Sequence, residues 1–182
     1  MAKRASEHVD SSRAELVIIT GLSGAGKATA LKALEDLGYY AVDNLPVGLL
    51  PKFAELAKDS ANVRHAAVVI DIREGENLKR FPAIFQRLKG RVPSTILYLE
   101  SDERTLMRRF SETRRPHPLG TESSVMKSVR MERERLAPIR KVADHIIDTS
   151  KFNVHELRSV IEDKFRDGNE QTQIRIDITS FG

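Results

Sequence analysis

A glycine-rich turn between an apolar run and a helical pattern constrains the fold more than any other stretch. The run at 16–19 reads Leu-Val-Ile-Ile, which is typical of a short buried strand. The segment at 21–27 reads Gly-Leu-Ser-Gly-Ala-Gly-Lys and matches G-x-x-x-x-G-K at every fixed position. Leucines at 31, 34 and 37 then follow at helical spacing. Strand, loop and helix in this order form the context of a phosphate-binding loop.

The chemistry of this loop suits a nucleoside triphosphate. Glycines permit positive φ, so successive N–H groups can turn toward one anion, and the next helix directs its N-terminal dipole there. Lys27 supplies a mobile positive charge for the β and γ phosphates. A glycine turn without a ligand is the alternative, and a Rossmann loop fits less well because its glycines read G-x-G-x-x-G. The predicted nucleotide-binding residues of the loop are Gly21, Leu22, Ser23, Gly24, Ala25, Gly26, Lys27, Ala28 and Thr29.

The residue after Lys27 departs from the usual pattern. Ser or Thr normally stands there and ligates the Mg²⁺ that bridges the phosphates, but Ala28 has no ligating atom. Thr29 is rotated by about 100° around the helix, so we do not expect it to replace that ligand, although it could reach the α-phosphate. We predict that nucleotide binding is retained while Mg²⁺-dependent hydrolysis is impaired.

Composition favours one α/β domain with a sizeable core. The chain has 182 residues, of which 40% are hydrophobic, and it has no cysteine, which excludes disulfides and thiolate zinc sites. No apolar run approaches the ~20 residues of a membrane span, and no signal peptide is recognisable, so we expect a cytoplasmic protein. Residues 1–14 are expected to form a flexible tail and residues 15–182 one nucleotide-binding domain. The net charge of +4 suits phosphate-bearing ligands but does not establish RNA binding.

Further apolar segments alternate with helical patterns along the chain. Strands are expected at 39–42, 66–71, 95–99, 145–148 and 174–178. Helices are expected at 47–58, 81–88, 103–114, from Ser123 or Ser124 past Arg133, and 154–165, with Pro138 kinking or dividing the fourth of them. Strands separated by helices predict a three-layer α/β fold of the kinase-like P-loop type. Its sheet should be mostly parallel and five-stranded, with an extra strand near the C-terminus.

Acidic residues follow two of the expected strands. Asp71 ends the apolar run 66–71, where a carboxylate would reach Mg²⁺ at the carboxyl edge of the sheet; otherwise it is a turn residue. Asp43 would lie on the same rim. It either adds a second metal-site carboxylate or, with Asn44, caps the helix that begins near Val47.

Basic residues gather around an expected loop at 115–120. Arg114 and Arg115 lie at the loop itself and are candidates to close on phosphates and neutralise the transferred charge. His117 stands between two prolines, and this position is more typical of a loop residue than of a catalytic base. The predicted catalytic residues are Lys27, Asp71, Arg114 and Arg115.

Charges on two of the expected helices are predicted to remain in solvent. Arg104 and Arg108 lie one turn apart, and pairing with Glu112 or Asp102 is the favoured interpretation. The long helix mixes both signs of charge, which predicts an exposed polar surface over Arg130, Glu132, Arg133, Glu134 and Arg135. The segment 148–150, Asp-Thr-Ser, either edges a nucleotide base or caps the helix that follows.

Several segments together resemble one family, the RapZ/YvcJ family of bacterial nucleotide-binding proteins. The resemblance covers nearly the whole chain from Glu15 onward, and the segments at 43–46 and 113–119 are far more specific than the loop alone. The segments that carry it are 21–27, 34–39 (Leu-Glu-Asp-Leu-Gly-Tyr), 43–46 (Asp-Asn-Leu-Pro), 111–119 (Ser-Glu-Thr-Arg-Arg-Pro-His-Pro-Leu), 148–150 and 180–182 (Ser-Phe-Gly).

The resemblance implies binding of ATP and GTP, with slow hydrolysis of both. It assigns the ATP site to 21–28, where the family has Ser in place of Ala28, and a guanine-nucleotide motif D-x-R-x to Asp71, Ile72, Arg73 and Glu74. Family members regulate amino-sugar and envelope metabolism. Some act as RNase adapters that bind small RNAs, mainly through a C-terminal domain that would begin where this sequence stops.

Three functional classes follow from these observations. The preferred one is a regulatory domain that binds ATP and GTP with Mg²⁺ and hydrolyses them weakly. A small-metabolite kinase is the second, suggested by the loop, Asp43 and the arginine-bearing segment. A non-enzymatic RNA-binding adaptor is the third. The sequence leaves open whether the protein forms a homo-oligomer.

Overall fold

Five parallel strands form the central sheet of the computed structural model, in the order β2-β3-β1-β4-β5. The structure describes residues 15–60, 63, 65–113, 117–119 and 124–166. β1 lies at the centre and is buried on both faces, as its continuous apolar run predicts. The strands are β1 (Glu15–Gly21), β2 (Tyr40–Val42), β3 (His65–Val69), β4 (Ser94–Glu100) and β5 (His145–Asp148).

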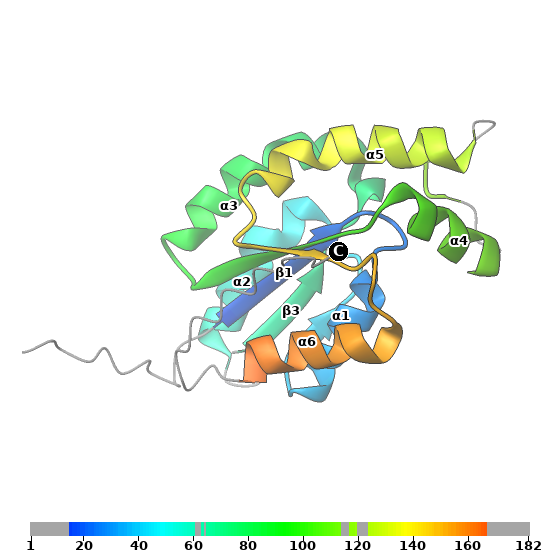
Figure 1. Ribbon diagram of the computed structural model, residues 1–182. Coiled ribbons are helices and arrows are strands. Elements are labelled where there is room, and N and C mark those ends of the chain that lie inside the picture. The colour runs from blue at the N-terminus through cyan, green and yellow to red at the C-terminus, as the bar shows by residue number, and fades with distance from the viewer. Residues whose placement is uncertain (1–14, 61–62, 64, 114–116, 120–123, 167–182) are drawn as a thin grey trace, which may run out of the picture.

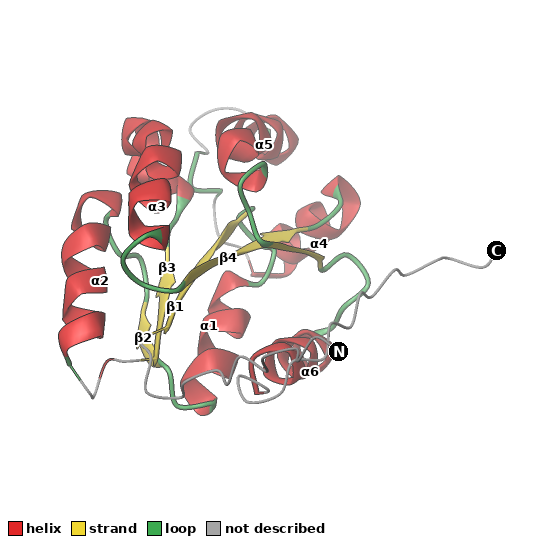
Figure 2. Ribbon diagram, turned by 90° about the vertical axis from the view of Figure 1, so that its left-hand side faces the viewer, coloured by secondary structure: helices red, strands yellow, loops and turns green. Residues whose placement is uncertain are grey.

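Helices connect the strands and cover both faces of this sheet, with α1 and α6 on one side and α2 and α3 on the other (Figure 2). The predicted three-layer α/β fold with a five-stranded parallel sheet is therefore confirmed. The helices are α1 (Lys27–Asp36), α2 (Leu50–Asp59), α3 (Phe81–Lys89), α4 (Glu103–Thr113), α5 (Val125–Arg140) and α6 (Val154–Arg166), together with the 3₁₀ segments η1 (Val47–Leu49) and η3 (Ile72–Arg80).

The chain diverges at the carboxyl ends of β1 and β3, and we call the space outside these two strand ends the crevice. These strands are neighbours, with Ile19 of β1 paired to Val69 of β3. The chain that leaves β1 enters α1 on one face, whereas the chain that leaves β3 leads through η3 to α3 on the other (Figure 2). In open parallel sheets, such a divergence is the place where ligands bind. The glycine-rich turn and Asp71 both lie at this point.

Some element boundaries differ from the sequence prediction. The helix expected from Val47 begins as the 3₁₀ segment η1, and β3 ends at Val69, so Asp71 caps η3 instead of closing the strand. Pro138 lies inside α5 without dividing it, because the carbonyl that it leaves without a partner belongs to the exposed residue Glu134, where water can solvate it. Ser124 is confirmed as the N-cap of α5.

Two further predictions fall outside the described residues. These are the tail at 1–14 and the strand at 174–178, and they stay predictions. Within the described part of the chain, every helix is too short or too polar to cross a membrane.

Candidate phosphate-binding site

The turn between β1 and α1 takes backbone conformations that require glycine. Gly21, Gly24 and Gly26 have φ values of +127°, +83° and +101°. A Cβ on Gly21 would collide with the backbone of Leu99 in β4, and a Cβ on Gly26 would lie 2.5 Å from Cδ2 of Leu157. The glycine spacing read from the sequence therefore has a double cause, which is positive φ and close packing at the same positions.

The start of α1 presents backbone N–H groups to the crevice. Gly26, in a left-handed conformation, is the N-cap residue of this helix, and no side chain in the described part of the chain caps it. The first N–H groups of a helix have no intrahelical partner, which here includes those of Lys27, Ala28 and Thr29. Within the described residues, the N–H groups of Gly24 and Gly26 also lack a hydrogen-bond partner. The turn thus offers a cluster of donors at the positive end of a helix dipole, which is an anion-binding arrangement.

Two side chains from later in the chain hold the carbonyl side of the loop. Arg109 of α4 donates from Nη1 to the Gly24 carbonyl at 3.0 Å, and Thr149 donates from Oγ1 to the Ala25 carbonyl at 3.0 Å. Arg109 also bonds Thr149 itself, at both its hydroxyl and its carbonyl. Because the C=O and N–H of one trans peptide point in opposite directions, the Gly26 N–H points away from Thr149.

Arg109 therefore stabilises the conformation of this loop. The sequence did not indicate this role, because Arg109 is one of several arginines in the same segment. A fourth bond, from Nη2 to the Phe152 carbonyl at 3.2 Å, completes its contacts. Burial lowers the pKa of the Arg109 guanidinium, yet an arginine remains charged at neutral pH. Figure 1 shows α4, α5 and β5 near the end of β1, where this loop begins.

Lys27 lies folded into the loop. Its Nζ donates to the carbonyls of Gly21 at 2.9 Å and Leu22 at 3.2 Å, and it is 3.6 Å from Oδ2 of Asp71. The lysine is 9% exposed, so its charge is held at the crevice by a carboxylate and two carbonyl dipoles. The structure thus brings together Lys27 and Asp71, two of the predicted catalytic residues.

The four residues at 71–74 point in different directions. The Asp71 carboxylate faces Lys27 and also accepts the N–H of Arg73 at 3.1 Å, whereas Ile72 is buried in the core. The Arg73 guanidinium is exposed, and Glu74 accepts the N–H of Val47 at 3.2 Å. Glu74 thus holds the start of η1.

Asp43 and Asn44 do not cap this segment. Pro46 is the N-cap residue of η1. Among the described residues, no side chain next to this segment in the sequence makes an N-cap hydrogen bond to it. Asp43 is exposed beyond the end of β2. The cap interpretation of Asp43 and Asn44 is wrong because Glu74, 27 residues away from Val47, supplies the acceptor. The role of Asp43 as a metal-site carboxylate stays a prediction.

The residues present fit a Mg²⁺ ion that the protein would hold jointly with the phosphates of a nucleotide. Within the described ranges, no three acidic or histidine side chains gather to hold a metal. Ala28 is exposed at the mouth of the loop and has no ligating atom. Mg²⁺ commonly takes one or two protein carboxylates and completes its shell with phosphate oxygens and water. Asp71, beside the loop lysine, fits the role of such a carboxylate.

A buried carboxylate lies behind the loop, where sequence reasoning placed a polar surface. Glu132 of α5 is fully buried. Its Oε2 accepts the N–H of Ser23 at 3.0 Å, and its Oε1 accepts the Ser23 hydroxyl at 2.7 Å. The prediction of an exposed mixed-charge face is therefore wrong for Glu132, whereas Arg130 and Arg133 on the same helix are exposed. The missed signal was periodicity, because position 132 falls on the buried stripe that includes Val129, Leu136 and Ile139.

His117 reaches the same carboxylate from the loop before α5. Its Nε2 lies 3.0 Å from Oε2 of Glu132, and its Nδ1 accepts the N–H of Leu119 at 3.1 Å. Because Nδ1 is an acceptor, the proton lies on Nε2 and the imidazole is neutral. His117 lies in a loop, as predicted. Its side chain is nevertheless buried, with 3% of its surface exposed. Arg114 and Arg115 lie outside the described residues.

The segment at 148–150 supports the loop and does not cap α6. Asn153 caps that helix, since its Oδ1 accepts the N–H of Glu156 at 3.0 Å while Glu156 accepts the N–H of Asn153 at 2.8 Å. The cap interpretation of 148–150 is wrong, because Thr149 is turned toward Ala25. The alternative, that this segment edges a nucleotide base, stays a prediction. Arg108 is exposed and lies 3.9 Å from Glu112, as the helix pattern predicted.

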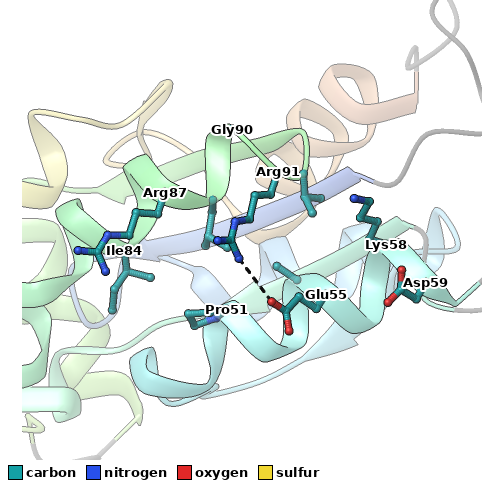
Figure 3. Close-up of a pocket in the computed structure, with 11 residues that line it drawn as sticks. Pro51, Glu55, Lys58, Asp59, Ile84, Arg87, Gly90 and Arg91 are labelled. Atoms are coloured by element: carbon teal, nitrogen blue, oxygen red, sulfur yellow. Dashed lines mark ion pairs between the residues drawn. The ribbon is translucent and has the colours of Figure 1, made fainter.

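A separate hollow of about 610 Å³ lies between α2 and α3 (Figure 3). An ion pair between Arg91 and Glu55, 3.5 Å apart, crosses it. Its lining includes none of the loop residues and mixes both signs of charge. We assign it no part in the phosphate site.

Comparison with known proteins shows which family the chain belongs to. A family model described as the RapZ-like N-terminal domain matches residues 14–170. The chain belongs to this family. The resemblance stated from the sequence is thereby confirmed.

Two relatives are named as nucleotide-binding proteins. One, from Koribacter versatilis, is 59% identical over 172 residues, which cover 92% of this chain and 55% of the relative. The other, from Solibacter usitatus, is 56% identical over 168 residues, which cover 92% of this chain and 52% of the relative. The chain thus spans about half the length of these relatives.

Solved structures show what fold the domain shares. A shikimate kinase from Acinetobacter baumannii, in complex with shikimate, superposes with a TM-score of 0.58 at 16% identity. The match covers 88% of this chain and 97% of the kinase. The predicted kinase-like P-loop fold is therefore confirmed.

Proposed function

We propose that this domain binds ATP or GTP at residues 21–29 and hydrolyses it slowly with Mg²⁺. The observation that carries the proposal is the start of α1, where Lys27 lies inside a glycine turn and the Gly24 and Ala25 carbonyls are held outward by Arg109 and Thr149. This geometry leaves the N–H side of the turn for phosphate oxygens. The printed names of the relatives, which are nucleotide-binding proteins, support it.

The chain's own groups divide the work. The N–H groups of Gly24, Gly26 and the first turn of α1 bind phosphate oxygens, and Lys27 exchanges its two carbonyl partners for the β and γ phosphates. Asp71 is the carboxylate that would hold Mg²⁺, and the ion would neutralise charge on the phosphates. Arg114 and Arg115 remain candidates to stabilise the charge that develops during hydrolysis.

Recognition of guanine nucleotides would involve 71–74. We propose that the exposed Arg73 side chain contacts the nucleotide there, whereas Ile72 and Glu74 set the backbone by packing in the core and by bonding Val47. Ala28 should slow the turnover further than in relatives that carry Ser at this position. A hydroxyl at this position would add a metal ligand, and its absence weakens the hold on Mg²⁺ without disturbing the amides that bind phosphate.

Nucleotide titration of the purified chain tests the proposal. ATP and GTP are titrated with and without Mg²⁺ against wild type, Lys27→Ala and Lys32→Ala. Lys32 is the matched control, because it lies on the same helix, is exposed and, among the residues that the structure describes, pairs with Glu35 and Asp36 alone. We expect Lys27→Ala to lose at least about tenfold in affinity and Lys32→Ala to bind as wild type does. A wild-type chain that binds neither nucleotide would overturn the proposal.

The same preparation separates the two other functional classes. Transfer of phosphate to a small metabolite, at a rate above background hydrolysis, would make the domain a kinase. RNA affinity that falls steeply with salt and ignores nucleotide would make it an adaptor.

A further inference from the structure

We propose that Glu132 is a positioning residue of the nucleotide site. It holds Ser23, the third residue of the phosphate loop, and thereby keeps the loop in the conformation that receives phosphates, while His117 holds Glu132 from behind. This inference rests on the proposed nucleotide binding and names a residue that sets its affinity.

The first step of the argument is the number of donors that meet this carboxylate. Oε2 accepts two N–H groups, from the Ser23 backbone and the His117 ring, each at 3.0 Å, and Oε1 accepts the Ser23 hydroxyl at 2.7 Å. All three residues are buried, so water does not compete for these bonds. Glu132 lies 109 residues after Ser23 along the chain, which makes it an attachment of the loop to a distant helix.

The second step is the peptide that this bond orients. The Leu22 carbonyl and the Ser23 N–H belong to one planar peptide and point in opposite directions. By fixing the N–H, Glu132 also fixes the carbonyl. That carbonyl accepts the Ala25 N–H at 3.0 Å and the Lys27 Nζ at 3.2 Å. Glu132 therefore acts through a single peptide on both the turn of the loop and one of the two carbonyls that hold Lys27.

The third step is the cost of this arrangement. A buried carboxylate loses its hydration, and the described ion pairs give Glu132 only His117, which is neutral in this tautomer. An apolar side chain on this stripe of α5 would avoid that cost. It would, however, leave the Ser23 N–H buried without an acceptor. The placement of a charge here is explained by what it does to the loop.

The fourth step links His117 to the loop by a second route. The Phe110 ring lies about 3.5 Å from the point that a Cβ on Gly24 would occupy, and its centroid is 5.2 Å from that of His117. His117 therefore contacts both the carboxylate that anchors Ser23 and an aromatic ring packed over Gly24. Its imidazole signals should respond when phosphate fills the loop.

Two substitutions of Glu132 separate its geometry from its charge. In Glu132→Gln, the amide oxygen can accept both N–H groups and the amide nitrogen can donate to the Ser23 hydroxyl, so the attachment is kept. In Glu132→Ala, all three donors lose their partner. Ser128→Ala is the matched control, since Ser128 lies one turn earlier on α5, is equally buried and has no hydrogen-bond partner for its hydroxyl within the described residues.

The experiment measures ATP affinity by titration and folding by thermal melting for each variant. We expect Glu132→Ala to bind ATP at least about tenfold more weakly, Glu132→Gln to stay within about threefold of wild type, and Ser128→Ala to match wild type. In ¹⁵N-histidine NMR at saturating ATP, the His117 ring signals should shift in wild type and Glu132→Gln, and should shift less in Glu132→Ala, where only the Phe110 contact still links His117 to the loop. A residue with a merely structural role would lower the melting temperature and leave these two readouts unchanged.

The outcomes distinguish this inference from the proposed function. If wild type binds no nucleotide, both fail. If wild type binds ATP and a folded Glu132→Ala variant binds it equally well, only the role of Glu132 is overturned. If Glu132→Ala does not fold, Ser23→Ala and His117→Ala take its place, since each removes one of the three hydrogen bonds to Glu132; His117→Ala also removes the contacts of the ring with Leu119 and Phe110. Unchanged ATP affinity in both would overturn the inference, and weakened affinity in both would support it.

Discussion

The two sides of the phosphate loop are built in opposite ways. The side that faces the crevice comes from one continuous stretch, 24–29, whose N–H groups at Gly24 and at 26–29 have no hydrogen-bond partner among the described residues. The opposite side is held by Arg109, Glu132 and Thr149, which lie 85 to 124 residues away from the loop residues that they bond. Within the described residues, these N–H groups make the crevice side the open side of the loop. On the supporting side, the Ser23 N–H and the Gly24 and Ala25 carbonyls are each hydrogen-bonded to a side chain. Such a division keeps the binding groups in place before the ligand arrives.

The comparison teaches that the loop's shape is a tertiary property. Glycines permit the turn, but several conformations are open to a stretch of glycine, alanine and serine. Three distant side chains select one of them by fixing the peptide before Ser23 and the two peptides on either side of Ala25. The predictions below test whether each side acts as described.

The largest effect is expected from Gly21→Ala, at the start of the loop. Its Cβ would meet the backbone of Leu99, and φ of +127° disfavours any side chain. We expect the free energy of unfolding to fall by about 3 kcal/mol, measured by chemical denaturation. Gly48→Ala is the control, because nothing lies within 4 Å of its Cβ position. Equal stability of the two variants would show that the close approach to β4 is relaxed at little cost.

The next effect concerns the supporting side. Arg109→Ala removes four hydrogen bonds to three carbonyls and a hydroxyl, and leaves the Gly24 carbonyl without its partner. We expect a loss of about 2 kcal/mol in stability and at least about tenfold in nucleotide affinity, measured by denaturation and titration. Arg108→Ala, which alters an exposed neighbour, should change neither. If the Arg109→Ala variant binds nucleotide as wild type does, the open side of the loop keeps its binding conformation without Arg109.

The third prediction sharpens the open side. Ala28→Ser restores a hydroxyl at the first turn of α1, where it can ligate the metal. We expect Mg²⁺-dependent turnover to rise by about tenfold, with nucleotide affinity in the absence of Mg²⁺ unchanged. Steady-state phosphate release measures it. The double variant with Lys27→Ala should show no gain, and unchanged turnover in Ala28→Ser alone would reject the explanation of slow hydrolysis.

The smallest effect is expected from Thr20→Val. The Thr20 hydroxyl is buried next to the loop and has no hydrogen-bond partner within the described residues. Replacing it with a methyl group of the same shape removes an unsatisfied polar group, so stability should stay the same or rise by up to about 1 kcal/mol. Thermal melting checks this. A marked loss of stability would mean that the hydroxyl has a partner that the hydrogen-bond pattern does not include.

The same division explains what could be read from the sequence. Strand, loop and α1 follow from local pattern, as do the parallel sheet and most helix positions, because apolar periodicity and glycine spacing act over short distances. The pairing of Asp71 with Lys27 was also within reach, since both follow strands at one sheet edge. The contacts of Glu132, Arg109 and Thr149 were not, because hydrogen bonds between distant residues leave no pattern along the chain.

Glu132 is the instructive failure among these residues. Its charge favoured solvent, whereas its position on the buried stripe of α5 favoured the core. The prediction followed the charge of the residue and placed it in solvent. The structure follows its position along the helix and places it in the core. A charged residue on an apolar stripe therefore marks a place to look for a buried partner.

The long reach of the loop's attachments has a consequence for how the chain matures. Ribosomes release residue 23 long before residues 132 and 149, and closing such large chain segments carries an entropic cost that only the finished sheet offsets. A nascent fragment that ends before β5 would contain the whole glycine signature, Arg109 and Glu132, and would still lack the Thr149 hydroxyl that holds the Ala25 carbonyl. Nucleotide should therefore bind more tightly to chains that extend past Thr149 than to shorter ones, and should stabilise the longer chains more.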